Sequence, residues 1–297
     1  MTVQGMNPRV EALLAAAAAT GMGSFVGAAM VASRYAIAET DPASLAFLRY
    51  LIGAAFLLPP VLMGNRPRFA RADVMPICLL GIAQFGILIA LLNYALQFIP
   101  AGLGALLFAT VPLLAMGLAT MLRIEPLTRW KTAGVLLTIV GVGLALGERL
   151  ALPRAGMETW LGIAAALASA FTGAVCSVLY RPYLAKYPAL PVSFVAMLAS
   201  VAFLAVLAAF EGFFGGVPSY SWATWGAIVF VGFASAAGYW LWLWALQHAT
   251  PTRVTVFIGL GPVVAAILGA ALLDEPVTPA LIAGVAAVLL GLWTANR

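Results

Sequence analysis

The stretch Tyr94-Ala95-Leu96-Gln97 returns 150 residues later as Trp244-Ala245-Leu246-Gln247. At the same offset, without a gap, the chain aligns Pro112 with Pro262, Glu125-Pro126 with Glu275-Pro276, Thr128 with Thr278, Gly134 with Gly284 and Gly141 with Gly291. A duplication inside an apolar chain is typical of transporters built from two related halves, with the substrate site between them. We therefore expect one repeat over residues 1–150 and a second over residues 151–297.

The composition predicts an integral membrane protein. The chain is 64% hydrophobic and 8% charged, with a mean hydropathy of +1.06, whereas a soluble domain carries about 25% charged residues. A membrane span needs about 20 apolar residues. Five charge-free stretches are long enough for one span or two: Ala12–Ser33, Val74–Leu122, Gly212–Thr252, Val254–Leu273 and Pro276–Asn296. The period-2 alternation of a membrane barrel is missing, so backbone in lipid must be satisfied within helices.

We predict ten transmembrane helices, because prolines, which suit helix starts and end the preceding helix, punctuate the apolar stretches. Their approximate ranges are 10–36, 44–63, 73–98, 101–122, 127–146, 157–183, 189–211, 221–247, 251–273 and 277–295.

The Lys and Arg residues predict that both termini are cytoplasmic. With the N-terminus inside, eleven of the 15 Lys and Arg residues lie on the cytoplasmic side, and only Arg34, Arg149 and Arg154 lie outside. This distribution follows the positive-inside rule. Because each half has an odd number of helices, the second half must be inverted relative to the first. The net charge of +5 is mostly this bias, and we expect no nucleic-acid partner.

Sequence motifs for catalysis are absent. There is no Gly-rich loop ending in Gly-Lys-Ser/Thr, no Gly-x-Ser-x-Gly elbow and no His-Glu-x-x-His. The single His248 does not complete a metal site with Cys78 and Cys176, which are expected to be packing residues. We therefore expect a protein that is not an enzyme and has no catalytic residue, cofactor or metal.

The acidic residues bear on energy coupling. All ten Asp and Glu residues fall near predicted helix ends or in loops, as does His248, whereas proton-driven carriers usually bury such a group within the membrane. We expect facilitated transport without obligatory ion coupling. Backbone carbonyls at Pro112 or Pro262 are an alternative source of a sodium site.

Two halves that each carry Pro, then Glu-Pro-x-Thr, then spaced glycines resemble the EamA repeat of the drug/metabolite transporter superfamily. The matching stretches are Leu45-Ala46-Phe47-Leu48-Arg49-Tyr50, Tyr94–Gly141 and Trp244–Gly291. In addition, Asn93-Tyr94-Ala95-Leu96-Gln97 and Tyr239-Trp240-Leu241-Trp242 are similar to the YddG group of bacterial aromatic amino acid exporters.

The resemblance implies an all-α membrane protein whose two inverted five-helix repeats surround a central cavity. Helices one, three, four, six, eight and nine would line this cavity, which opens to one side at a time. The implied function is export of aromatic and other apolar amino acids from the bacterial inner membrane by alternating access. A different small metabolite or a cationic drug is the alternative cargo. The expected partners are this small-molecule substrate and the lipid bilayer, with the protein as a monomer.

Small and helix-breaking residues in the predicted core have two interpretations. Ser24 and Gly27 in the first helix and Thr172 in the sixth either allow close helix packing or leave room for a ligand. Pro112 in the fourth helix and Gly261-Pro262 in the ninth either tolerate a kink or expose backbone at the midplane, where transporters bind.

Larger side chains supply the other candidate contacts. Gln84 and Tyr94 are candidates in the third helix, although an amide can simply bond a neighbouring helix. Tyr239 and Trp240 in the eighth helix either form a wall for a flat apolar ring or belong to an interfacial aromatic belt. We expect backbone groups and neutral side chains to meet the substrate's carboxylate and ammonium, because the sequence shows no buried charge pair.

Arg49 is the one cation well inside a predicted helix, roughly 9 Å from its outer end. It either snorkels to the outer interface, or acts as a gate contact or an attraction for a carboxylate at the outer mouth.

Overall fold

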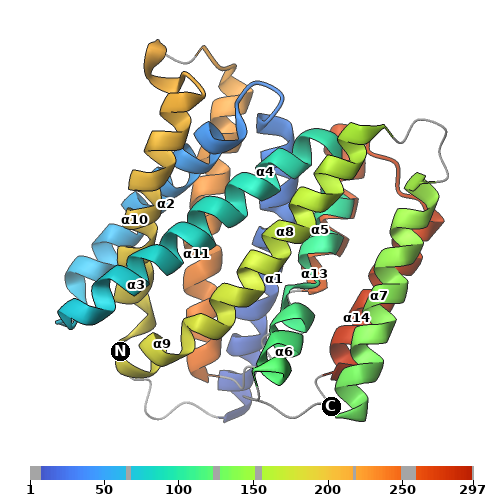
Figure 1. Ribbon diagram of the computed structural model, residues 1–297, viewed down its shortest axis with the longest axis horizontal. Coiled ribbons are helices and arrows are strands. Elements are labelled where there is room, and N and C mark those ends of the chain that lie inside the picture. The colour runs from blue at the N-terminus through green and yellow to red at the C-terminus, as the bar shows by residue number, and fades with distance from the viewer. Residues whose placement is uncertain are drawn as a thin grey trace.

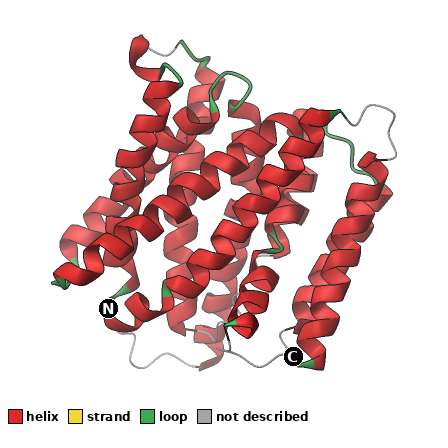
Figure 2. Ribbon diagram, in the orientation of Figure 1, coloured by secondary structure: helices red, strands yellow, loops and turns green. Residues whose placement is uncertain are grey.

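The computed structural model describes residues 8–64, 68–122, 128–150, 156–216, 219–248 and 259–295. Every regular element in these ranges is helical (Figure 2). The first half contains α1 (Pro8–Ala36), α2 (Pro42–Met63), α3 (Arg71–Gly81), the π-helix η1 (Ile82–Ile87), α4 (Leu88–Phe98), α5 (Ala101–Phe108), α6 (Val111–Met121) and α7 (Arg129–Leu150). The second half contains α8 (Met157–Leu179), α9 (Arg181–Lys186), α10 (Ala189–Phe210), the 3-10 helix η2 (Phe213–Gly215), α11 (Trp222–His248), α13 (Leu260–Leu273) and α14 (Pro279–Ala295).

These elements confirm the predicted all-helical architecture. The third predicted helix is continuous but contains the π-helical turn η1 between α3 and α4. The fourth is interrupted at Ala109 and Thr110, just before Pro112. The first part of the ninth, residues 251–258, lies outside the described ranges, and the rest is α13.

Length and composition mark the chain as a multi-pass membrane protein. Within the described ranges, six helical segments are long and apolar enough to cross a membrane: 42–63, 71–98, 101–118, 157–186, 189–210 and 222–241. Shorter apolar helices cover 132–145, 260–273 and 279–294. Large apolar side chains such as Phe210 and Ile267 are exposed on the outside of the bundle, as expected for a surface that meets lipid.

The helices end at two opposite faces of the bundle (Figure 1). We call one the Glu39 face. It carries the α1–α2, α4–α5, α10–α11 and α13–α14 connections. The other is the Lys186 face, where α2 ends, α3 begins and α9 leads into α10.

Carboxylates cap three helix starts on the Glu39 face. The pairs are Glu211 with Ala43 and Ser44 of α2, Glu275 with Ala101 of α5, and Glu39 with Ser221 just before α11. The donor–acceptor distances lie between 2.7 and 3.0 Å. The first N–H groups of a helix lack partners within the helix, and negative charge is favourable there. These bonds tie the ends of helices from different parts of the chain together.

Glycines set the closest helix contacts. Helices α7 and α14 lie side by side at one edge of the bundle (Figure 1). A Cβ on Gly141 would lie 2.7 Å from the Gly284 carbonyl oxygen, and a Cβ on Gly291 would lie 2.7 Å from that of Gly134. Backbones therefore meet directly in this pair. Small residues permit such approach, which supplies much of the attraction between helices in lipid.

This contact predicts different effects of one methyl group at two positions of α7. Gly141→Ala should lower the thermal unfolding midpoint of the purified protein by roughly 2–10 °C, because overpacking a tight contact costs about 1–3 kcal/mol. Gly143→Ala is the matched control, since a Cβ there meets nothing within 4 Å. Equal midpoints for the two variants would contradict the contact.

Candidate functional site

A cavity of about 300 Å³ lies at the centre of the bundle. Both halves line it, the first through α1, α2, η1, α4, α5 and α6 and the second through α8, α10 and α11. The lining is mostly apolar, with Met22, Phe25, Leu88 and Met197 among its members. Its polar members are Arg49, Tyr50, Gln84, Ser177, Ser235 and Tyr239. A concave, largely apolar site with a few polar groups is the usual form of a small-molecule site.

Three rings form a connected aromatic set in this cavity. Tyr50 of α2 meets Phe85 of η1 edge-to-face at a centroid distance of 5.3 Å. Phe85 meets Tyr239 of α11 in the same way at 6.0 Å. The Tyr239 hydroxyl is hydrogen-bonded to the hydroxyl of Ser193 on α10. Edge-to-face pairs fix the orientation of each ring, so Tyr50, Phe85 and Tyr239 present one aromatic wall contributed by both halves.

The π-helical turn positions Gln84 and Phe85. A π-turn adds a residue to the helical repeat and shifts the faces on either side of it. Gly81 just before the turn and Gly86 within it both contact α10: Gly81 packs on the Ala196 backbone, and a Cβ on Gly86 would lie 3.0 Å from the Phe203 ring. Just beyond it, the Leu88 carbonyl accepts a hydrogen bond of 2.8 Å from the Ser169 hydroxyl of α8. The turn is thus held between two helices of the other half.

The break between α5 and α6 brings Phe108 and Val111 to the cavity wall. Thr110 lies in the break, and its hydroxyl donates to the Leu107 carbonyl at 2.6 Å. Pro112 occupies the first turn of α6, where the absent N–H costs no helical hydrogen bond. Pro112 itself is not among the described lining residues.

Arg49 lies in the cavity wall beside the aromatic set. Its Nε–H donates to the Ser235 hydroxyl of α11 at 2.7 Å, and its guanidinium carbon lies 5.6 Å from the centroid of the Tyr50 ring. Helices α2 and α11 are close here, since a Cβ on Gly232 would lie 3.2 Å from the Arg49 carbonyl oxygen. This close contact between α2 of one half and α11 of the other brings Arg49 next to Ser235.

The remaining candidates from the sequence lie elsewhere. Tyr94 is 37% exposed and lines a separate groove of about 620 Å³ near the Glu39 face, together with Gln97 and Glu211. Trp240 is 51% exposed and does not belong to the described cavity lining. Neighbouring residues of a helix point about 100° apart, so Tyr239 faces inward while Trp240 faces out.

The small-residue candidates also fall outside the described lining. Gly27 of α1 packs against the backbone of Gly261 in α13, and Pro262 follows within the first turn of that helix. The Thr172 hydroxyl bonds the Ala168 carbonyl of its own helix at 2.8 Å, and Ser24 is half-buried on α1. Of the eleven candidates, the structure brings together Gln84, Tyr239 and Arg49.

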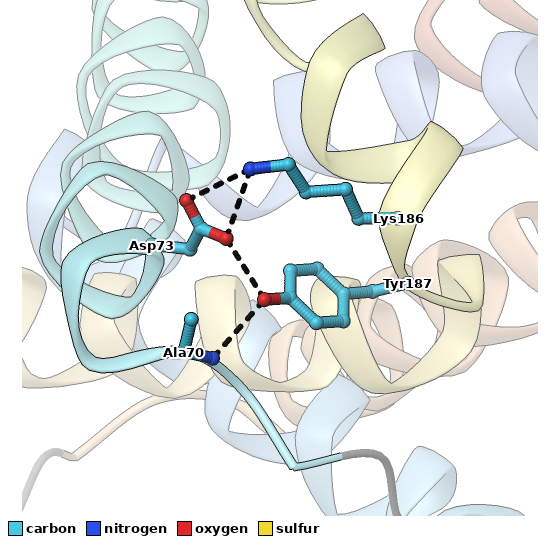
Figure 3. Close-up of polar contacts among 4 residues, drawn as sticks. All are labelled: Ala70, Asp73, Lys186 and Tyr187. Carbon is cyan, nitrogen blue, oxygen red and sulfur yellow. Dashed lines mark hydrogen bonds and ion pairs between the residues drawn. The ribbon is translucent and has the colours of Figure 1, made fainter.

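The hydrogen bonds and ion pairs of the acidic residues lie outside the cavity. Figure 3 shows Asp73 on the Lys186 face, paired with Lys186 at 3.2 Å and accepting a hydrogen bond of 2.8 Å from the Tyr187 hydroxyl. The Tyr187 oxygen in turn accepts the Ala70 N–H at 3.0 Å. None of the carboxylates whose side chains the structure describes lines the cavity.

The comparison with protein families agrees with this architecture. Residues 12–147 and 160–297 each match the EamA-like transporter family. The chain belongs to that family. It is therefore a transporter with two EamA repeats and not an enzyme.

Known relatives of this EamA protein share its length but leave the cargo unspecified. An uncharacterized transporter of Archaeoglobus fulgidus is 26% identical over 276 residues, which cover 92% of this chain and 95% of the relative. The uncharacterized transporters YyaM and YoaV of Bacillus subtilis are 26% and 23% identical over 93% and 90% of this chain, and 91% of each relative is covered. A crystal structure of another protein superposes with a TM-score of 0.67 at 22% identity, covering 96% of both chains, which supports the fold alone.

Proposed function

We propose that this EamA protein exports aromatic and other apolar amino acids across the bacterial inner membrane by alternating access. The observation that carries the proposal is the wall of Tyr50, Phe85 and Tyr239 in a central cavity lined by both halves. A flat apolar ring packs well on such a wall. The cavity volume of about 300 Å³ is at the lower end of the range of about 300–1,000 Å³ for small-molecule sites.

Sequence resemblance supports the same cargo. The stretches Asn93–Gln97 and Tyr239–Trp242 are similar to bacterial aromatic amino acid exporters, and Tyr239 belongs to the cavity wall. The alternative is another EamA cargo, a different small metabolite or a cationic drug. The Arg49 charge in the wall disfavours a cation, because like charges in a poorly solvated site repel strongly.

The two repeats give the proposed mechanism its symmetry. We assign residues 1–150 and 151–297 to two inverted halves in a monomer, which expose the cavity to each side in turn. In this orientation the Lys186 face, which carries Arg68, Arg71 and Arg129, is cytoplasmic together with both termini. The Glu39 face is then outside, and its capped helix ends join elements of both halves there.

No ion gradient is required in this scheme. The carboxylates of Glu39, Asp73, Glu211 and Glu275 accept hydrogen bonds at helix ends, and those of Asp41, Glu158 and Asp274 lie exposed there, away from the cavity. A proton-driven carrier needs a titratable group that faces both sides in turn. Export is then driven by accumulation of the amino acid in the cytoplasm.

Counterflow in proteoliposomes tests the cargo and the coupling together. Vesicles loaded with unlabelled phenylalanine should transiently accumulate labelled phenylalanine at equal pH and without sodium. Leucine and tryptophan should compete, and an aromatic cation should not. Absence of phenylalanine counterflow would reject the cargo, whereas flux that appears only under an imposed pH or sodium gradient would reject uncoupled transport.

Adjacent side chains on α11 provide a matched test of the aromatic wall. Tyr239→Ala removes a ring of the wall and should lower the initial rate of phenylalanine transport at least fivefold at subsaturating substrate. A lost ring–ring contact and its buried apolar area cost about 1–3 kcal/mol of binding. Trp240→Ala should change the rate less than twofold, because Trp240 faces away from the cavity. The reverse order of effects would show that the wall is misassigned.

Reporter fusions test the orientation. A reporter joined after Gly64 should report the cytoplasm, and one joined after Gly216 should report the outside, because Arg66 and Arg68 follow Gly64 and Arg71 begins α3. An outside signal after Gly64 would contradict the inverted-repeat arrangement.

A further inference from the structure

The guanidinium of Arg49 is only partly satisfied by the protein. An arginine side chain has five N–H donors and is always charged. Its Nε–H is bonded to Ser235, and no further hydrogen-bond partner of Arg49 occurs among the described residues. The ion pairs that join described residues are Arg34 with Glu275 and Lys186 with Asp73, neither of which involves Arg49. A charge in an apolar wall is costly without a counter-ion.

The contact with Ser235 fixes how the guanidinium is presented. The Ser235 hydroxyl donates its own proton to the Val231 carbonyl at 2.6 Å, so its oxygen is left to accept from Arg49. The bond engages Nε and leaves the paired Nη1 and Nη2 groups for another partner. Two parallel N–H groups on a guanidinium match the two oxygens of a carboxylate. The guanidinium therefore offers a directional pair of N–H groups on Nη1 and Nη2, which we call the fork, rather than a diffuse charge.

The same fork lies next to the aromatic wall. Tyr50 has its ring centroid 5.6 Å from the guanidinium carbon and is also the first ring of the wall. A ligand that pairs with Arg49 thus has its remaining body in contact with Tyr50 and the rings beyond it. The described cavity lining contains no carboxylate beside Arg49 that would hold the ammonium group of a ligand.

We propose that Arg49 is the carboxylate-binding residue of the cavity and that the carboxylate, not the amino group, decides which apolar molecules are bound. The substrate class is an aromatic or apolar carboxylate, of which amino acids are one kind. Ser235 is a positioning residue that holds the guanidinium by Nε. The inference rests on the proposed function for the aromatic part of the ligand, but the role of Arg49 holds for any cargo with a carboxylate.

A series of four ligands tests this on the purified full-length protein by calorimetric titration. The series is phenylalanine, phenylalaninamide, 3-phenylpropionate and phenethylamine, which share a ring and differ in charge. The wild type should bind phenylalanine and phenylpropionate within about fivefold of each other, and should bind phenylalaninamide and phenethylamine at least tenfold more weakly. Charge-assisted hydrogen bonds are roughly twice as strong as neutral ones, and a tenfold difference in Kd corresponds to about 1.4 kcal/mol.

Variants test whether the preference for ligands with a carboxylate depends on Arg49. Arg49→Gln should weaken phenylalanine and phenylpropionate binding at least tenfold, and should leave phenylalaninamide binding equal or stronger, because the repulsion between two positive charges is lost. Arg49→Lys should retain part of the preference, and Ser235→Ala should reduce it severalfold. Arg71→Gln removes one exposed positive charge outside the cavity and should behave as the wild type. A purely structural role for Arg49 would weaken all four ligands alike.

Two results overturn the inference. One is binding of phenylalaninamide or phenethylamine by the wild type as strong as that of phenylalanine. The other is binding of phenylalanine by Arg49→Gln at the wild-type affinity. Both results are compatible with transport of phenylalanine, so neither of them rejects the proposed function. If Arg49→Gln does not fold, the ligand series on the wild type and on Ser235→Ala decides the matter. Leucine is titrated in the same way. Arg49-dependent binding of leucine, with no binding of phenylalanine or phenylpropionate, would reject the aromatic cargo and support the role of Arg49.

Discussion

Helices in a bilayer gain little by burying apolar side chains against each other, because lipid tails are equally apolar. This bundle is held instead where backbones meet without side chains between them, as at Gly141 with Gly284 and at Gly27 with Gly261. Where large rings such as Phe85 and Tyr239 point inward, the helices stay apart. The central cavity lies there, so the distribution of small and large residues determines both the packing and the site.

The charged residues are also separated, with the carboxylates at the two faces of the bundle and Arg49 in the cavity wall. The carboxylates of Glu39, Glu211 and Glu275 bond the starts of helices on one face, and hydrogen bonds from the Ser221 N–H and hydroxyl lower the pKa of Glu39 below its ordinary value. Asp73 is paired with Lys186 on the other face. The cavity wall, as far as the structure describes it, therefore holds the positive charge of Arg49 without a compensating carboxylate. A cavity of this kind favours an apolar ligand that brings its own negative group.

The helices in the described part of the chain could be predicted because apolar runs, prolines and isolated charges are all local features of the sequence. The rotation of each helix could not. Helix α11 is apolar on all sides, so no periodicity distinguishes Tyr239, which faces the cavity, from Trp240, which does not. Gln84 and Tyr94 are both candidates in the third predicted helix, but only Gln84 lines the cavity, and the π-helical turn shifts the faces between them. The sequence of this turn, Ile82–Ile87, contains no proline or charged residue that would indicate a break in the α-helix.

Arg49 shows a third limit. Its position inside an apolar run marks it as unusual, but the sequence alone leaves open whether it snorkels to the outer interface or acts as a gate contact. The contact that carries it into the wall is made with α11, 186 residues away in the chain. The central claim is that the cavity beside Arg49 is reached from both sides of the membrane. A cysteine at Gln84, in protein without Cys78 and Cys176, tests it with an impermeant thiol reagent applied to either side of oriented proteoliposomes. We predict reaction from both sides, slowed in each case by phenylalanine. Reaction from one side only, or rates that phenylalanine leaves unchanged, would contradict the account.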